Sequence, residues 1–183
     1  VTNVESWDGS SWTETTDTSN ARSHAAGGGI QTAALAVGGA QPGGSALNEQ
    51  WDGSSWTEVG DLNTAVTLCG SNGTTSSMMV AGGQRAGEAY ENICEQWDGS
   101  SWTEVADLNT ARIDAGGCGD GALFLAAAGS ISHPAPYSAV AEEWNGSSWA
   151  EGDDLNQPQS FFNSAGGTTT SAIAMGGQAG APQ

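Results

Sequence analysis

The sequence predicts an all-β fold made of repeated units, and three observations carry this prediction. All eight tryptophans lie in four copies of one hexapeptide, and residues 49–59 are identical to residues 95–105. Only 13% of the residues are charged and 28 of 183 are glycine, a composition typical of short strands and tight turns. The hexapeptide is Trp-Asp-Gly-Ser-Ser-Trp, with Asn for Asp in the last copy, at residues 7–12, 51–56, 97–102 and 144–149.

Each repeat is predicted to contain four short strands. A strand of small residues leads through a turn to an apolar strand that ends in a glycine pair, as in residues 35–39 and 79–83, although the third copy has only Ala128-Gly129. A variable loop leads to a third strand, and the Asp-Gly hairpin joins it to a fourth, because Asp-Gly tolerates positive φ. The first Trp recurs after 44, 46 and 47 residues, and four strands at this period are typical of a β-propeller blade.

The glycine pair, the aromatic residue after it and the second Trp a few residues later resemble the kelch repeat along the whole chain. The resemblance implies that the strand after Asp-Leu-Asn-Thr-Ala-Arg is innermost in each blade. It also implies that the Gly-Gly strand is second and that the two Trp-bearing strands are outermost. The chain departs from the family in using Trp where Tyr is usual, in its broken third glycine pair and in having fewer repeats.

We therefore expect a single domain over residues 1–183, a four-bladed β-propeller of four-stranded antiparallel blades with one blade assembled from both termini. Joining residues 178–183 to residues 1–4 would form a loop of 10 residues, against 9, 11 and 12 in the interior repeats. The sequence leaves open whether this pairing occurs within one chain or between chains. The expected repeat units are about 15–59, 60–105, 106–152, and 153–183 completed by 1–14.

The charge balance excludes two classes of partner. The chain has no lysine, three arginines, 21 acidic residues and a formal net charge of -18, so it cannot neutralise nucleic-acid phosphates or an anionic membrane. No apolar run approaches the ~20 residues that span a bilayer, so no membrane insertion is expected. Cys69, Cys94 and Cys118 lack zinc-site spacing, and one disulfide with one free thiol is open to them.

Catalytic, metal and cofactor sites are not expected. His24 and His133 fall at unlike positions in their repeats, and Asp8, Asp52 and Asp98 each suit a turn better than a calcium site, which needs six to eight oxygens. Asn72 and Asn145 begin glycosylation sequons in predicted turns. The tryptophans either pack between blades or form a platform that stacks on sugars: Trp7, Trp12, Trp51, Trp56, Trp97, Trp102, Trp144 and Trp149.

These observations favour a non-enzymatic, extracellular structural propeller on a cell or virion surface. Its expected partner is itself, in an appendage or fibre built by complementation with the N-terminal strands. The alternative is a propeller module that binds carbohydrate or a receptor, as in a lectin or viral fibre. Its binding face would then be formed by the variable loops at residues 40–48, 84–94 and 130–141, with glycans as the partner.

Overall fold

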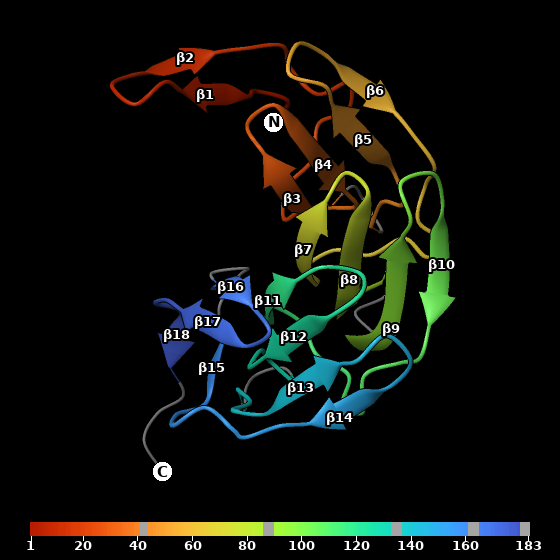
Figure 1. Ribbon diagram of the computed structural model, residues 1–183, viewed down its shortest axis with the longest axis vertical. Helices are drawn as coiled ribbons and strands as arrows, with labels where there is room; N and C mark the ends of the chain where they lie inside the picture. The colour runs from red at the N-terminus through yellow and green to blue at the C-terminus, as the bar shows by residue number, and fades with distance from the viewer. Residues whose placement is uncertain (41–43, 86–89, 133–136, 161–164, 180–183) are drawn as a thin grey trace.

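The computed structural model describes residues 1–40, 44–85, 90–132, 137–160 and 165–179. Every regular element in these ranges is a β-strand, and none of them contains a helix that could cross a membrane. Three four-stranded antiparallel sheets follow one another along an open arc, with a two-stranded half-blade at each end (Figure 1). The prediction of an all-β propeller is confirmed.

The three complete blades each consist of four strands that are consecutive in the sequence. Blade 1 contains β3 (Ala26–Ile30), β4 (Ala33–Val37), β5 (Asn48–Trp51) and β6 (Trp56–Glu58). Blade 2 contains β7 (Gly70–Thr74), β8 (Ser77–Gln84), β9 (Tyr90–Trp97) and β10 (Trp102–Val105). Blade 3 contains β11 (Gly116–Gly119), β12 (Phe124–Ala127), β13 (Ala141–Trp144) and β14 (Trp149–Glu151).

The strands of a fourth blade are present as two halves. The N-terminal hairpin is formed by β1 (Glu5–Trp7) and β2 (Trp12–Glu14), the outer pair. The C-terminal half-blade is formed by β16 (Ala165–Thr168) and β17 (Ser171–Ala174), the inner pair, beside the short pair β15 (Gln159–Ser160) and β18 (Gln178–Ala179). Within one chain the halves stay in separate sheets at opposite ends of the arc (Figure 1).

The Asp-Gly hairpin joins the outer strands of blade 1 through local contacts. Oδ1 of Asp52 accepts hydrogen bonds from the backbone N–H of Ser54 (2.8 Å) and of Ser55 (2.9 Å). Gly53 has φ 96°, in the left-handed region that glycine enters without a steric penalty. Trp51 and Trp56 consequently face each other across the strand pair, with ring centroids 5.4 Å apart.

Small residues in the innermost strands allow neighbouring blades to pack backbone against backbone. A Cβ atom added to Gly117 on β11 would lie 2.8 Å from the backbone nitrogen of Ser71 on β7. Such an approach excludes any side chain, which is why the inner strands consist largely of Gly, Ala and Ser.

The apolar core lies between blades rather than within one sheet. Leu35 and Val37 of β4 pack against Val80 and Trp97 of blade 2. The next interface repeats this arrangement with residues of blades 2 and 3: Met79, Ala81, Cys94, Phe124, Ala126, Trp144 and Trp149. Each blade therefore needs a following blade to bury the apolar side chains of its second strand.

Candidate assembly surface

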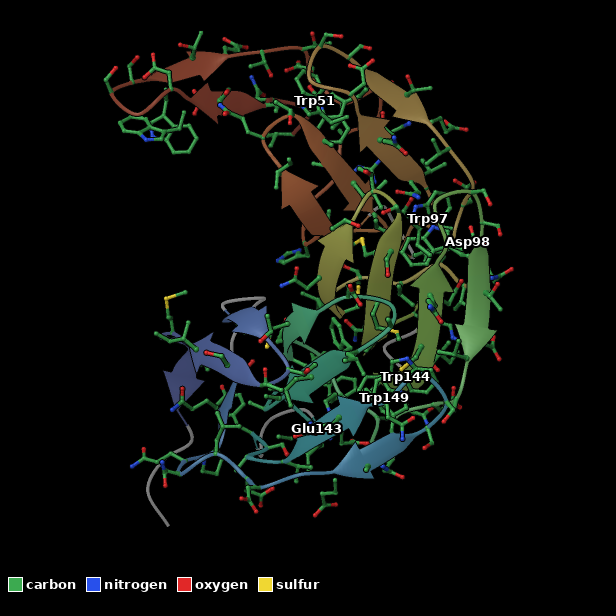
Figure 2. All side chains as sticks on the ribbon, viewed as in Figure 1. Trp51, Trp97, Asp98, Glu143, Trp144 and Trp149 are labelled. Atoms are coloured by element: carbon green, nitrogen blue, oxygen red, sulfur yellow. The ribbon has the colours of Figure 1, made fainter. Side chains whose placement is uncertain are left out.

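The tryptophans of blades 2 and 3 lie in the interfaces between blades. Trp97 is 1% exposed and Trp144 3%, and Figure 2 shows Trp51, Trp97 and Trp144 on successive blades of the arc. The indole Nε1 of Trp51 donates a hydrogen bond of 2.9 Å to the carbonyl oxygen of Gln31, in the turn between the two inner strands. Trp97 and Trp144 make the same contact, with the carbonyl oxygens of Thr75 and Gly121.

The tryptophans of the N-terminal hairpin have the same local geometry but a different environment. The rings of Trp7 and Trp12 are 5.5 Å apart, yet these residues are 44% and 65% exposed. In each complete blade, the third strand carries the first Trp of the hexapeptide and also pairs with the second strand of that blade, as Trp97 on β9 pairs with Met78 on β8. In the described residues β1 pairs only with β2, so the hairpin has a free edge.

The C-terminal half-blade exposes the complementary edge. Ile173 and Met175 are 60% and 54% exposed, whereas their counterparts in blade 1, Leu35 and Val37, are 2% and 0% exposed. Among the described strands β17 pairs only with β16. The half-blade thus lacks both an outer strand pair and a following blade.

A cavity of about 570 Å³ lies between the N-terminal hairpin and blade 1. Its walls include four indole rings and two aliphatic side chains: Trp7, Trp12, Trp51, Trp56, Ile30 and Ala34. In the complete interfaces, the apolar side chains of a preceding second strand pack against the corresponding surface. The cavity therefore has the position and chemistry of a socket for Ile173 and Met175.

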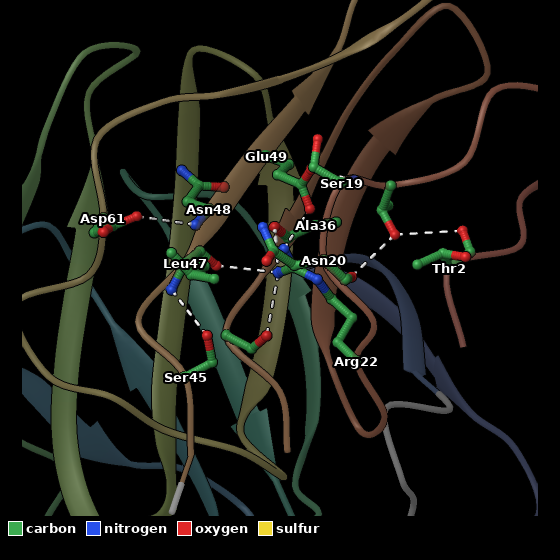
Figure 3. Close-up of polar contacts among 12 residues, drawn as sticks. Thr2, Ser19, Asn20, Arg22, Ala36, Ser45, Leu47, Asn48, Glu49 and Asp61 are labelled. Carbon is green, nitrogen blue, oxygen red and sulfur yellow. Dashed lines mark hydrogen bonds and ion pairs between the residues drawn. The ribbon is translucent and has the colours of Figure 1, made fainter. Parts of the chain in front are cut away.

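Each complete blade also buries one glutamate on its third strand. Glu49 forms an ion pair with Arg22, and Arg22 Nη1 donates to the carbonyl oxygens of Ala36, Gly38 and Leu47 (Figure 3). These contacts attach the link that enters the blade to the middle of the sheet.

Blade 3 repeats this ion pair with Arg112 and Glu142, whose side chains are both fully buried. In blade 2 the glutamate, Glu95, accepts its hydrogen bonds from neutral donors of Asn63 and Thr64 among the described residues. These glutamates are not among the site residues expected from the sequence. The signal that could have revealed their role is the joint recurrence of the glutamate and the Asp-Leu-Asn link.

The hairpin aspartates act as turn residues. The hydrogen bonds from the backbone and side chains of the following serines lower the pKa values of Asp8, Asp52 and Asp98 to about 2. In the part of the chain that the structure describes, no three His, Cys, Asp or Glu side chains come together as a metal site would require.

The two sequon asparagines differ in position. Asn145 lies in the exposed hairpin turn of blade 3, where its Oδ1 accepts hydrogen bonds from Ser147 and Ser148. Asn72 does not lie in a turn as predicted. It is part of β7, and its Nδ2 donates to the carbonyl oxygen of Gly117 in the neighbouring blade, because the inner strands pack closely.

The cysteines form no disulfide, so the pairing that the sequence left open does not occur. Cys69, Cys94 and Cys118 are all free and buried. Burial raises the pKa values of the Cys69 and Cys94 thiols to about 12, which suits apolar packing and disfavours the reactive thiolate.

The structure describes one of the two histidines, His24. His24 has φ 51° just before β3, and the corresponding residues of the next two links, Leu68 and Asp114, have φ 58° and 54°. The backbone N–H of Asp114 donates to the carbonyl oxygen of Leu68. His133 lies outside the described residues, as do residues 41–43, 86–89 and 134–136 of the variable loops.

Comparison with known proteins shows that solved structures share this fold. No protein-family model and no curated protein matches the chain, whereas 142 chains of solved structures do. The solved structure of YjhT is similar, with a TM-score of 0.71 and 11% sequence identity. The match covers 85% of this chain and 59% of YjhT, so the chain spans less than two thirds of that protein. At this identity the likeness concerns the fold alone.

Proposed function

We infer that this protein is a non-enzymatic structural propeller with kelch-type repeats, whose copies associate head to tail. In this assembly the N-terminal hairpin of one copy completes the C-terminal half-blade of the next. The observation that carries the proposal is the contrast between Trp7, 44% exposed, and its buried counterparts Trp97 and Trp144. Exposed strand edges with unburied apolar side chains recruit a partner.

Two features favour a second copy over closure within one chain. The half-blades lie at opposite ends of the arc (Figure 1). The arc also superposes on part of a longer chain, of which the match covers 59%. Pairing within one chain would require these two ends to come together, whereas they lie in separate sheets at opposite ends of the arc. A head-to-tail contact that does not close forms a fibre.

The polar surface supports a location on the outside of a cell or virion. A chain with no lysine and a net charge of -18 stays soluble and avoids nonspecific binding to nucleic acid. We place the assembly in a surface appendage on this basis.

The test uses two variants of the full chain. Trp7→Ala with Trp12→Ala removes the apolar face of the hairpin, and Ile173→Ser with Met175→Ser removes that of the half-blade. Each variant is expected to sediment as a monomer at concentrations where the parent associates. An equimolar mixture retains one intact interface and is expected to form dimers. A parent chain that is monomeric at every concentration contradicts the proposal.

A second candidate function is carbohydrate binding, because the cavity beside the hairpin is lined by four indole rings. Indoles stack on the apolar faces of sugars. A glycan array tests this function. Carbohydrate binding is favoured over assembly if the parent binds glycans, the Trp7→Ala, Trp12→Ala variant does not bind them, and the parent does not self-associate.

A further inference from the structure

The buried glutamate of blade 2 shows how a third strand binds the link that enters its blade. One carboxylate oxygen of Glu95 accepts hydrogen bonds from the backbone N–H of Asn63 (2.8 Å) and from Asn63 Nδ2 (2.9 Å). The other oxygen accepts one from the backbone N–H of Thr64 (2.8 Å). Glu95 is 2% exposed, so this carboxylate depends on these donors.

Blade 3 has the same contact between the glutamate of its third strand and the asparagine of the link that enters the blade. Glu142 accepts from the backbone N–H and from Nδ2 of Asn109, both at 2.7 Å, and is 0% exposed. In both blades the asparagine ends the Asp-Leu-Asn link. The contact is therefore a property of the repeat.

In the fourth repeat the two sides of this contact lie in different half-blades. Glu5 on β1 occupies the glutamate position, and Asn156 ends the link that leads into β15. Both residues are exposed. Within the described residues neither side chain has a hydrogen-bond partner.

We propose that Glu5 of one copy binds Asn156 of a second copy, and that this contact sets the register of the composite blade. The inference rests on the proposed head-to-tail assembly and names the polar contact within it. The carboxylate of Glu5 accepts from the backbone N–H and Nδ2 of Asn156, and from the backbone N–H of Gln157. These donors correspond to those that hold Glu95.

The residue register between β1 and β17 of the second copy follows from the complete blades. Trp51, Trp97 and Trp144 pair with Ala34, Met78 and Phe124 on their second strands. The corresponding register places Trp7 opposite Ala172, and Glu5 opposite Ala174, on β17 of the second copy. A slip of one residue would turn Glu5 to the other face of the sheet, away from Asn156. The glutamate thus selects one register, whereas apolar contacts alone tolerate several.

The residue that stands in each link at the position of Arg22 and Arg112 indicates that this contact needs no cation. Arg22 and Arg112 pair with the glutamates of blades 1 and 3, but Val66 stands at this position in blade 2 and Gln159 in the fourth repeat. Glu5 is therefore expected to be held by neutral donors, as Glu95 is. Hydrogen bonds to an ionised group are stronger than those between neutral groups.

The experiment measures self-association of full-length variants by sedimentation velocity. Glu5→Gln presents an amide N–H₂ group to hydrogen-bond donors and is expected to weaken association on the order of ten- to a hundredfold. Glu14→Gln is the matched control. It removes the same charge from the same hairpin, and the counterparts of Glu14 in the complete blades stay exposed: Glu58, Glu104 and Glu151. The control is expected to associate as the parent does.

Asn156→Ala is expected to weaken association by a similar factor, and the double variant Glu5→Gln, Asn156→Ala by little more than either change. Mixing the two single variants leaves one interface with both native groups, so mixed dimers of parental affinity are expected. If Glu5→Gln associates as strongly as the parent while the Trp7→Ala, Trp12→Ala variant does not associate, the proposed Glu5 contact is wrong and the head-to-tail assembly still stands. Parental association of both variants overturns both proposals.

Discussion

Arg112 Nη2 lies 2.5 Å from Glu142 Oε1, and both side chains are 0% exposed. Burial lowers the pKa of Arg112, and the adjacent carboxylate of Glu142 opposes this shift. Arg112 Nη1 also donates to the carbonyl oxygens of Ala128 and Val140. One guanidinium thereby joins the link that enters blade 3 to its second and third strands.

Glu142→Gln is expected to destabilise the chain by about 3–5 kcal/mol, because it leaves a buried guanidinium without a counter-charge. Glu143→Gln is the control, since Glu143 is the next residue on the same strand and is exposed. Urea unfolding followed by tryptophan fluorescence measures both. Equal stability of the two variants would show that the ion pair contributes nothing.

Trp97→Ala is expected to cost about 3–5 kcal/mol, because Trp97 is 1% exposed and its removal leaves a cavity between blades. Trp12→Ala at concentrations where the chain is monomeric is expected to change stability by no more than about 0.5 kcal/mol, since Trp12 is 65% exposed. The midpoints of thermal unfolding of the two variants measure these changes in stability. A large loss for Trp12→Ala would indicate that the hairpin is already packed within one chain.

Ala128→Gly is expected to stabilise the chain by up to about 1 kcal/mol. Ala128 has φ 63°, the conformation that glycine adopts at the corresponding Gly38 (φ 60°) and Gly82 (φ 66°). Relief of the left-handed strain exceeds the added entropy of the unfolded chain. Ala127→Gly, one residue earlier within β12, is the control and is expected to be destabilising. The prediction fails if both changes lower the unfolding midpoint.

Burial raises the pKa of Asp114 from 3.8 to about 6. The folded chain therefore binds this proton more tightly than the unfolded chain, so the contribution of Asp114 to stability is highest below pH 4. It is lost as the pH rises through 6. Asp114→Asn is expected to remove this part of the pH dependence and to raise stability at pH 7. Unfolding curves at pH 4, 5, 6 and 7 measure the difference, and an unchanged slope in the variant would contradict it.

The thiols of Cys69 and Cys94 are expected to resist a disulfide reagent in the native chain and to react at once in urea. Their pKa values are raised to about 12 by burial, so almost no thiolate is present at pH 8. Absorbance of the released thiolate follows the reaction. Rapid native labelling of either residue, assigned by mass spectrometry, would contradict the burial.

Local features of this protein are determined by its sequence alone. The Asp-Gly hairpins and their glycines with positive φ depend on residues a few positions apart, so one repeat contains all the information for them. The period near 46 residues then predicts several similar blades. No distant contact has to be known for any of these conclusions.

Only the tertiary structure decides which copies of a repeated residue are buried. Trp7 and Trp97 stand in identical hexapeptides, yet one is 44% exposed and the other 1%. The same holds for Glu5 and Glu95, because Glu95 meets Asn63, which is 32 positions away in the sequence. Burial depends on whether a neighbouring strand and blade are present, and this is a property of the assembled sheets rather than of the local sequence.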